Sequence, residues 1–168
     1  MALLALLLLT LLATVLSSSS AKITSEIGVC YGQGGNNLPT PSKSTQLLQK
    51  LNATQVKLYN ADQKVLNALK GSNIHVTVMV PNELIINMSS NQTLADQWVQ
   101  SNVVPFYPQT MIRYILVGNE VLSNSFKPQW FYLVPAMKKI NQSVKTFGLH
   151  NIKVGTPLSF DVVESSVL

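Results

Sequence analysis

The feature that most constrains the fold is a nearly continuous apolar run from Ile112 to Val117, which ends in Gly118-Asn119-Glu120. A short run rich in β-branched residues predicts a strand buried on both faces, as the strands of a parallel sheet are. In α/β barrels the chemistry sits at the C-terminal ends of such strands, because the strands hold residues rigidly there. Glu120 comes directly after the run and is therefore the first candidate catalytic residue.

Further elements alternate along the chain. Five short strand-like runs lie at residues 27–31, 55–59, 75–80, 112–117 and 152–156. In the segments between them, apolar residues recur at helical spacing. This order predicts an α/β fold with a parallel sheet and right-handed crossovers. The pattern stops after the fifth strand, so we expect about five βα units of a larger barrel. A complete (β/α)₈ barrel needs roughly 250 residues, and this chain has 168.

Capping residues predict where the helices begin. Thr40-Pro41 supplies an N-cap with proline at the first helical position, and Asp62 caps the next helix. Thr93 and Asp96 have the spacing of a capping box with aspartate in place of glutamate. Pro135 lies inside the last helical pattern and either kinks that helix or marks its start.

Several residues are expected to serve packing. Cys30, the one cysteine of the chain, lies within an apolar strand and is predicted to be a buried, inert thiol. Trp98 and Trp130 lie on apolar helical stripes, which favours a core position. A further apolar stripe on the first helix consists of Leu47, Leu48 and Leu51.

The first 21 residues are leucine-rich and end in small residues with Ala21 at the last position, which predicts a secretory signal cleaved after Ala21. A membrane anchor is the weaker interpretation, because the apolar run is short for a bilayer span. Residues 22–168 would then form the mature partial barrel domain, secreted to the extracellular space or cell wall and without a stable membrane span. Four sequons, at Asn52, Asn87, Asn91 and Asn141, are candidate glycosylation sites in such a chain.

Charge and motif patterns argue against several functions. The chain carries 12 Lys plus Arg against 7 Asp plus Glu. Its lysines are scattered, as on the solvated edges of successive elements, and no aromatic residues lie between them, so no nucleic-acid partner is expected. These lysines include Lys43, Lys50, Lys57, Lys64 and Lys70. The loop 32–37 lacks the last glycine of a dinucleotide-binding motif, since that position is Asn37. His75 and His150 have no acidic residue at ligand spacing, so neither a metal nor another cofactor is predicted.

The polar residues at predicted strand ends favour carbohydrate chemistry. Glycoside hydrolysis uses two carboxyl groups across the scissile bond, and Glu120 can be the one that protonates the leaving oxygen. Asn119 could bind a sugar hydroxyl, and Tyr59 offers a flat apolar face with a polar tip. Tyr31 ends the first strand and is a third candidate for substrate binding. Tyrosine in a strand is, however, more often a packing residue.

Several motifs in this order resemble the plant β-1,3-glucanases of glycoside hydrolase family 17. The resemblance covers residues 27–160 and rests on 27–32 (IGVCYG), 36–39 (NNLP), 56–62 (VKLYNAD), 98–100 (WVQ), 114–121 (YILVGNEV) and 133–137 (LVPAM). It implies a (β/α)₈ barrel that cleaves internal bonds of 1,3-β-glucan with retention of configuration, as a monomer when complete. It also implies that Glu120 is the proton donor and that Tyr59 and Asn119 lie in the substrate cleft.

One departure from the family pattern bears on activity. The nucleophile of the family is a glutamate in a Glu-(Ser/Thr)-Gly-Trp-Pro motif, which this sequence does not contain; Glu164 is followed by Ser165-Ser166 and does not replace it. The chain as written is therefore expected to be inactive alone. The alternatives are a non-catalytic glucan-binding or wall-associated protein and an incomplete product that does not fold alone. Longer forms could add a carbohydrate module or a lipid anchor.

Overall fold

The computed structural model describes residues 26–123 and 127–162, so the predicted signal segment lies outside the described residues. Five strands form one sheet in sequence order, and every neighbouring pair is parallel. The strands are β1 (Gly28–Tyr31), β2 (Gln55–Leu58), β3 (His75–Val80), β4 (Met111–Val117) and β5 (Lys153–Gly155). All five predicted strands and their parallel order are confirmed.

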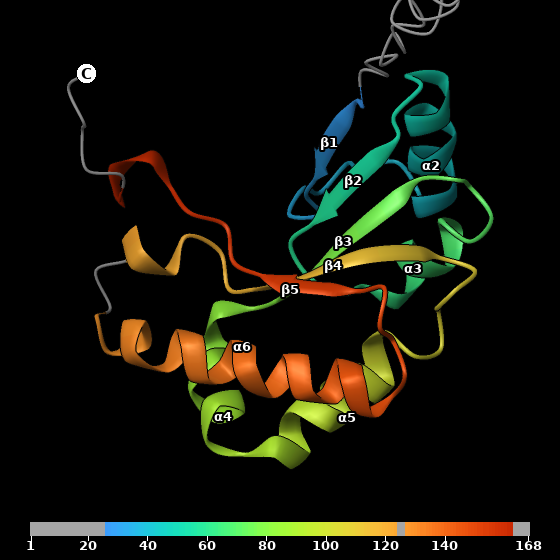
Figure 1. The fold of residues 1–168 in the computed structure, drawn as a ribbon. Coiled ribbons are helices and arrows are strands. Elements are labelled where there is room, and N and C mark those ends of the chain that lie inside the picture. The colour runs from blue at the N-terminus through green and yellow to red at the C-terminus, as the bar shows by residue number, and fades with distance from the viewer. Residues whose placement is uncertain (1–25, 124–126, 163–168) are drawn as a thin grey trace, which may run out of the picture.

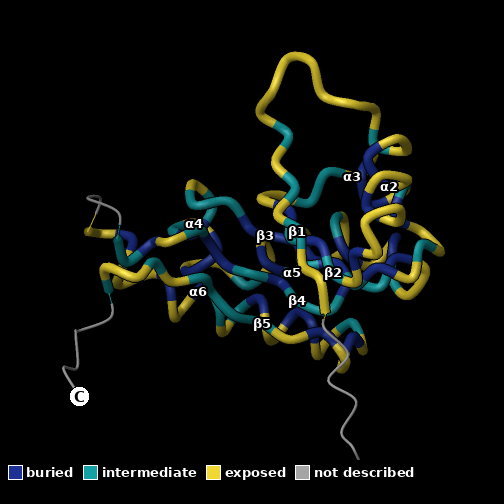
Figure 2. Tube along the Cα trace, turned by 90° about the horizontal axis from the view of Figure 1, so that it is seen from above, coloured by how far each residue is buried: buried dark blue, intermediate teal, exposed yellow. Residues whose placement is uncertain are grey.

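The helices lie along one side of the curved sheet (Figure 1). They are α2 (Pro41–Lys50), α3 (Gln63–Ala68), α4 (Ile85–Ser90), α5 (Gln92–Asn102) and α6 (Pro128–Thr146), with short 3₁₀ turns η1 (Asn82–Leu84), η2 (Val121–Ser123) and η3 (Phe160–Val162). The loop between β1 and α2 extends away from the sheet and is largely exposed (Figure 2). No helix in the described part of the chain is long and apolar enough to span a bilayer.

The helix starts follow most of the predicted capping. The Thr40 side chain accepts a hydrogen bond from the backbone of Lys43, and Asp62 accepts bonds from the backbone N–H groups of Lys64 and Val65. Helix α6 begins at Pro128 and runs through Pro135, so Pro135 does not mark its start.

The predicted capping box at Thr93 is wrong. Asn91 caps α5 instead, because its side chain accepts a hydrogen bond from the Thr93 N–H. The Asp96 side chain faces α6. Its Oδ1 accepts a hydrogen bond from Ser143 Oγ on α6 at 2.7 Å and one from Gln92 Nε2 on α5 at 2.9 Å. The carboxylate therefore joins two helices rather than closing the first turn of one.

The contact between Asp96 and Ser143 predicts a pH-dependent stability. The hydrogen bonds from Ser143 and then Gln92 lower the pKa of Asp96 below its usual 3.8. A lowered folded-state pKa means that this stabilisation is present above the unfolded-state pKa and is lost as the pH falls through the folded-state pKa. We expect Asp96→Asn to destabilise the chain by about 1 kcal/mol near neutral pH, and the difference from wild type to vanish at low pH. Urea unfolding from about pH 2 to pH 7 measures this difference.

The matched control for this experiment is Glu83→Gln, which changes a carboxylate on the exposed side of η1. We expect it to leave the free energy of unfolding nearly unchanged at neutral pH. A difference between wild type and Asp96→Asn that is the same at both ends of the pH range would contradict the assigned role of the carboxylate.

The core lies between the sheet and the helices, and only this side of the sheet is well covered within the described residues. In β4, Ile112, Ile115 and Val117 are buried, whereas Tyr114 and Leu116 on the opposite, inner face are half-buried. The prediction that this strand is buried on both faces is therefore only half confirmed. The inner face is the one that the remaining strands of a closed barrel would cover.

Within residues 26–123 and 127–162 the sheet has two unpaired edges, β1 and β5, and three packing predictions are wrong. Cys30 on edge strand β1 is exposed, not buried. Leu47 and Leu51 of α2 are 42% and 61% exposed, although Leu48 between them is buried. At the other end of the sheet Trp130 on α6 is 37% exposed, whereas Trp98 lies in the core as expected. Cys30 lies on the less covered inner face of the sheet, and Leu47 and Leu51 lie on α2 beside the edge strand β1.

Candidate active site

The C-terminal ends of the strands meet at one edge of the sheet. Val80 at the end of β3 pairs with Val117 at the end of β4, and the Gly118 N–H donates to the Val80 carbonyl at 2.8 Å. The residues that follow these strands, Asn82 and Asn119, are thereby brought side by side. Glu120 comes next in the chain and lies at the same edge of the sheet.

The backbone of the Gly118-Asn119-Glu120 turn is unusual. Gly118 has φ +70° and Glu120 has φ +49°, both in the left-handed region. A non-glycine residue in this region costs about 1–3 kcal/mol, and such residues cluster at functional sites. The Glu120 carbonyl then accepts from the Ser123 N–H as η2 begins, so the exposed Glu120 lies between two ordered segments.

Asn82 holds this turn through its side-chain amide. The Asn119 N–H donates to Asn82 Oδ1 at 2.6 Å, and Asn82 Nδ2 donates to the Asn119 carbonyl at 3.1 Å. The carbonyl of Asn82 in turn accepts from Nε2 of the buried Gln129 on α6 at 3.1 Å. Three segments are thus joined around Asn119. Asn82 is not among the predicted site residues, because its only sequence signal is that of a polar residue after a buried strand.

Lys57 also belongs to this site, and the prediction that it is a solvated lysine is wrong. It is half-buried on the inner face of β2. Lys57 Nζ donates to Asn119 Oδ1 at 3.3 Å and lies 4.8 Å from the centroid of the Tyr59 ring. The main chain of Asn119 is therefore bound by Asn82, which follows β3, and its side chain is bound by Lys57 on β2.

Tyr59 lies beside this cluster and keeps an exposed ring. It is 44% exposed and follows β2 directly. Hydrogen bonding and Coulombic interaction with the Cys30 side chain raise the pKa of Tyr59, and partial burial and the carboxylate of Glu120 add smaller effects in the same direction. The phenol is therefore neutral at physiological pH, with its exposed ring available to a neutral ligand.

Tyr31 is not brought together with the other candidates. It pairs with the buried Leu58, so it lies on the helix-facing side of the sheet, whereas Cys30 pairs with Lys57 on the inner face. Tyr31 packs against the core and lines an apolar groove with Leu47 and Leu51 of α2. This placement disagrees with the prediction of a cleft residue.

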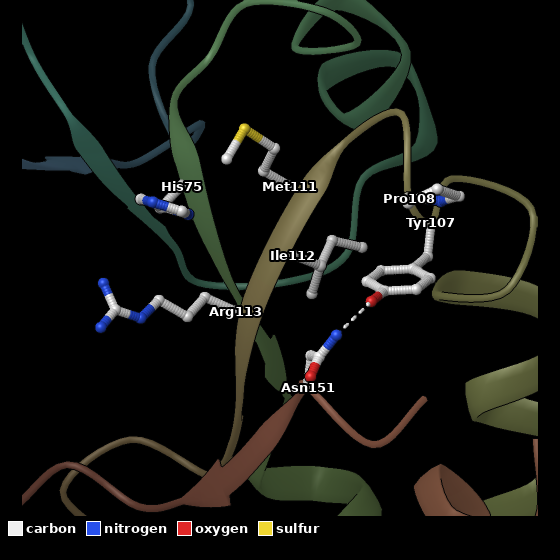
Figure 3. Close-up of a pocket in the computed structure, with 7 residues that line it drawn as sticks. All are labelled: His75, Tyr107, Pro108, Met111, Ile112, Arg113 and Asn151. Atoms are coloured by element: carbon white, nitrogen blue, oxygen red, sulfur yellow. Dashed lines mark hydrogen bonds between the residues drawn. The ribbon is translucent and has the colours of Figure 1, made fainter. Parts of the chain in front are cut away.

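A pocket of about 320 Å³ lies at the other end of the strands (Figure 3). Its lining includes His75 and Arg113 on one side of β4, and Tyr107 and Asn151, joined by a hydrogen bond of 3.4 Å, on the other. These polar groups do not converge on one point. Residues at this N-terminal end of a barrel mostly serve stability. Within residues 26–123 and 127–162, no three His, Cys, Asp or Glu side chains are grouped to hold a metal ion.

Comparisons with known proteins agree with one another. The sequence pattern of Glycosyl hydrolases family 17 matches residues 27–167. Probable glucan endo-1,3-beta-glucosidase A6 of Arabidopsis thaliana is 51% identical over 86% of this chain and 30% of its own length. Glucan endo-1,3-beta-glucosidase of Pisum sativum is 40% identical over 84% of this chain and 39% of its own length. The solved structure of CJP38, a beta-1,3-glucanase and allergen of Cryptomeria japonica pollen, superposes with a TM-score of 0.81 at 40% identity, covering 84% of this chain and 45% of that one. The chain thus spans less than half of the length of each of these relatives.

Proposed function

Because the chain belongs to glycosyl hydrolase family 17, we propose that residues 26–162 form one side of a cleft for 1,3-β-glucan in which Glu120 is the proton donor. The observation that carries this proposal is the strained turn that delivers Glu120 at the C-terminal edge of the sheet, held by Asn82. Plant relatives named as glucan endo-1,3-beta-glucosidases support the choice of substrate.

The proposed reaction is cleavage of internal 1,3-β-glucosidic bonds with retention. The Glu120 carboxyl group donates its proton to the leaving glycosidic oxygen while a second carboxylate attacks the anomeric carbon. Water, deprotonated by Glu120, then releases the sugar from the covalent intermediate. Tyr59 would contact a sugar ring and Asn119 a sugar hydroxyl.

The 168-residue chain alone is expected to be inactive, since its sequence has no Glu-(Ser/Thr)-Gly-Trp-Pro segment to supply the nucleophile. A lone general acid contributes only about 10²–10⁴ in rate. We expect no release of reducing sugar above background from linear 1,3-β-glucan by the purified chain. Release that is abolished by Glu120→Gln would contradict this expectation and place a complete catalytic pair in the chain.

Glucan binding without hydrolysis is the second candidate function, and the exposed ring of Tyr59 favours it. In a pull-down with insoluble 1,3-β-glucan, retention that depends on Tyr59 but not on Glu120 would support binding as the role of this chain. We further propose that the protein is secreted. The leucine-rich start supports this, as does the exposure of all four sequon asparagines.

A further inference from the structure

We infer that Lys57 is a positioning residue that fixes the side-chain amide of Asn119, so that the Nδ2 group of Asn119 faces the cleft as a hydrogen-bond donor. The ligand group it would meet is an acceptor oxygen of a neutral sugar. This inference rests on the proposed function for the identity of the ligand, but its central geometric statement concerns the protein alone.

The chemistry of the two side chains sets the orientation of the amide. A lysine ammonium can only donate hydrogen bonds, whereas an asparagine amide has one accepting oxygen and one donating NH₂ group. Lys57 Nζ lies 3.3 Å from Asn119 Oδ1, and the reversed amide would direct two donors at each other. Lys57 therefore selects one of the two orientations of the amide.

The ammonium group is itself held in place. Its Nζ lies 4.8 Å from the centroid of the Tyr59 ring, within the range of an attractive cation–π contact. Lys57 forms the last pair of the β2–β3 pairing, opposite Thr77, so its stem still emerges from a paired strand. Because the position of this ammonium group is fixed, it can hold the Asn119 amide in one orientation, which a solvated lysine could not do.

The main chain of Asn119 is fixed independently. The side-chain amide of Asn82 binds the backbone of Asn119 twice: its Oδ1 accepts from the Asn119 N–H at 2.6 Å, and its Nδ2 donates to the Asn119 carbonyl at 3.1 Å. The position of the Asn119 backbone is thus fixed, and only its side chain can rotate. Because Asn119 Oδ1 is bound to Lys57, the Nδ2 group is the one left for a ligand. A carbonyl bound to a cation also polarises the amide, which strengthens the N–H groups as donors.

The test uses nuclear magnetic resonance on the 168-residue chain, first without ligand. We expect one set of Asn119 side-chain NH₂ signals in wild type, changed signals in Lys57→Met, and near-wild-type signals in Lys57→Arg, which keeps a cationic donor. Lys64→Met, on the exposed side of α3, is the matched control and should leave these signals in place. Thermal unfolding checks that each variant is folded, and Lys57→Leu, which also lacks a donor, replaces Lys57→Met if that variant is not.

The second arm adds a soluble linear 1,3-β-gluco-oligosaccharide. We expect the Asn119 NH₂ signals of wild type to shift, with Lys57→Met weakening the affinity about tenfold and Lys57→Arg restoring most of it. Unchanged ligand-free Asn119 signals in a folded Lys57→Met overturn the inference. Equal affinity of wild type and Lys57→Met also overturns it. Failure of wild type to bind the oligosaccharide, with the ligand-free result as expected, counts instead against the proposed function.

Discussion

Gly118→Ala is expected to destabilise the chain by about 2–5 kcal/mol, a large part of the 5–15 kcal/mol that holds a typical domain folded. The first contribution is the backbone. Gly118 has φ +70°, and placing a residue with a Cβ there costs about 1–2 kcal/mol. The second is steric overlap in a packed region, which typically adds about 1–3 kcal/mol.

The overlap arises because three segments meet at Gly118. A Cβ there would lie 2.4 Å from Val121 Cγ2, 2.8 Å from Ile85 Cδ1 and 3.0 Å from Asn82 Oδ1. Val121 and Ile85 are buried, so neither can move away without disturbing the core. The Asn82 contact adds a functional consequence, because displacing its oxygen breaks the bond to the Asn119 N–H.

Gly71→Ala is the matched control for this prediction. Gly71 has φ +68°, but a Cβ there would meet no atom within 4 Å. It therefore isolates the backbone cost, about 1–2 kcal/mol, from the steric cost. Chemical unfolding of both variants gives the two free energies. Equal destabilisation by Gly118→Ala and Gly71→Ala would show that the turn relaxes around the added methyl group.

The local parts of the fold could be predicted because their signals lie within a few residues. The β3 run from His75 to Val80 and the caps at Thr40 and Asp62 depend on apolar spacing and on side chains that bind the nearest backbone N–H groups. The prediction of Glu120 as a catalytic residue uses a signal of the same kind, a carboxylate that follows a buried strand and a glycine.

The parts that could not be predicted depend on pairing between distant segments. Whether Tyr31 faces the cleft is decided by its pairing with Leu58, and a shift by one residue would reverse its side. Asn82 and Asn119 are 37 positions apart, and Lys57 and Asn119 are 62 apart. No property of Lys57 within its own strand separates it from the solvated lysines. The exposure of Cys30 and Leu51 likewise depends on which parts of the sheet and of α2 are left uncovered, which only the assembled fold reveals.

The second large effect concerns Glu120 and requires a form that contains a complete catalytic pair. We suggest a chimera that joins residues 26–162 to the part of the Cryptomeria japonica glucanase that the superposition does not cover. Under the proposed function, we expect the added part to pair with the edge strands β1 and β5 and to carry the second carboxylate. If the proposed function is right, this chimera hydrolyses linear 1,3-β-glucan.

In that chimera, Glu120→Gln is expected to lower kcat/KM for linear 1,3-β-glucan by about 10²–10⁴. The amide is nearly isosteric with the carboxyl group but has no proton to give to the leaving oxygen, so binding should be largely kept. The loss should be much smaller for an aryl 1,3-β-glucoside with an acidic phenol, because that leaving group departs without protonation and only the later, base-catalysed step still needs Glu120. Steady-state kinetics on both substrates separates the two roles of the residue. Equal losses on the two substrates would mean that Glu120 acts through the structure of the turn, and that the proton donor lies elsewhere.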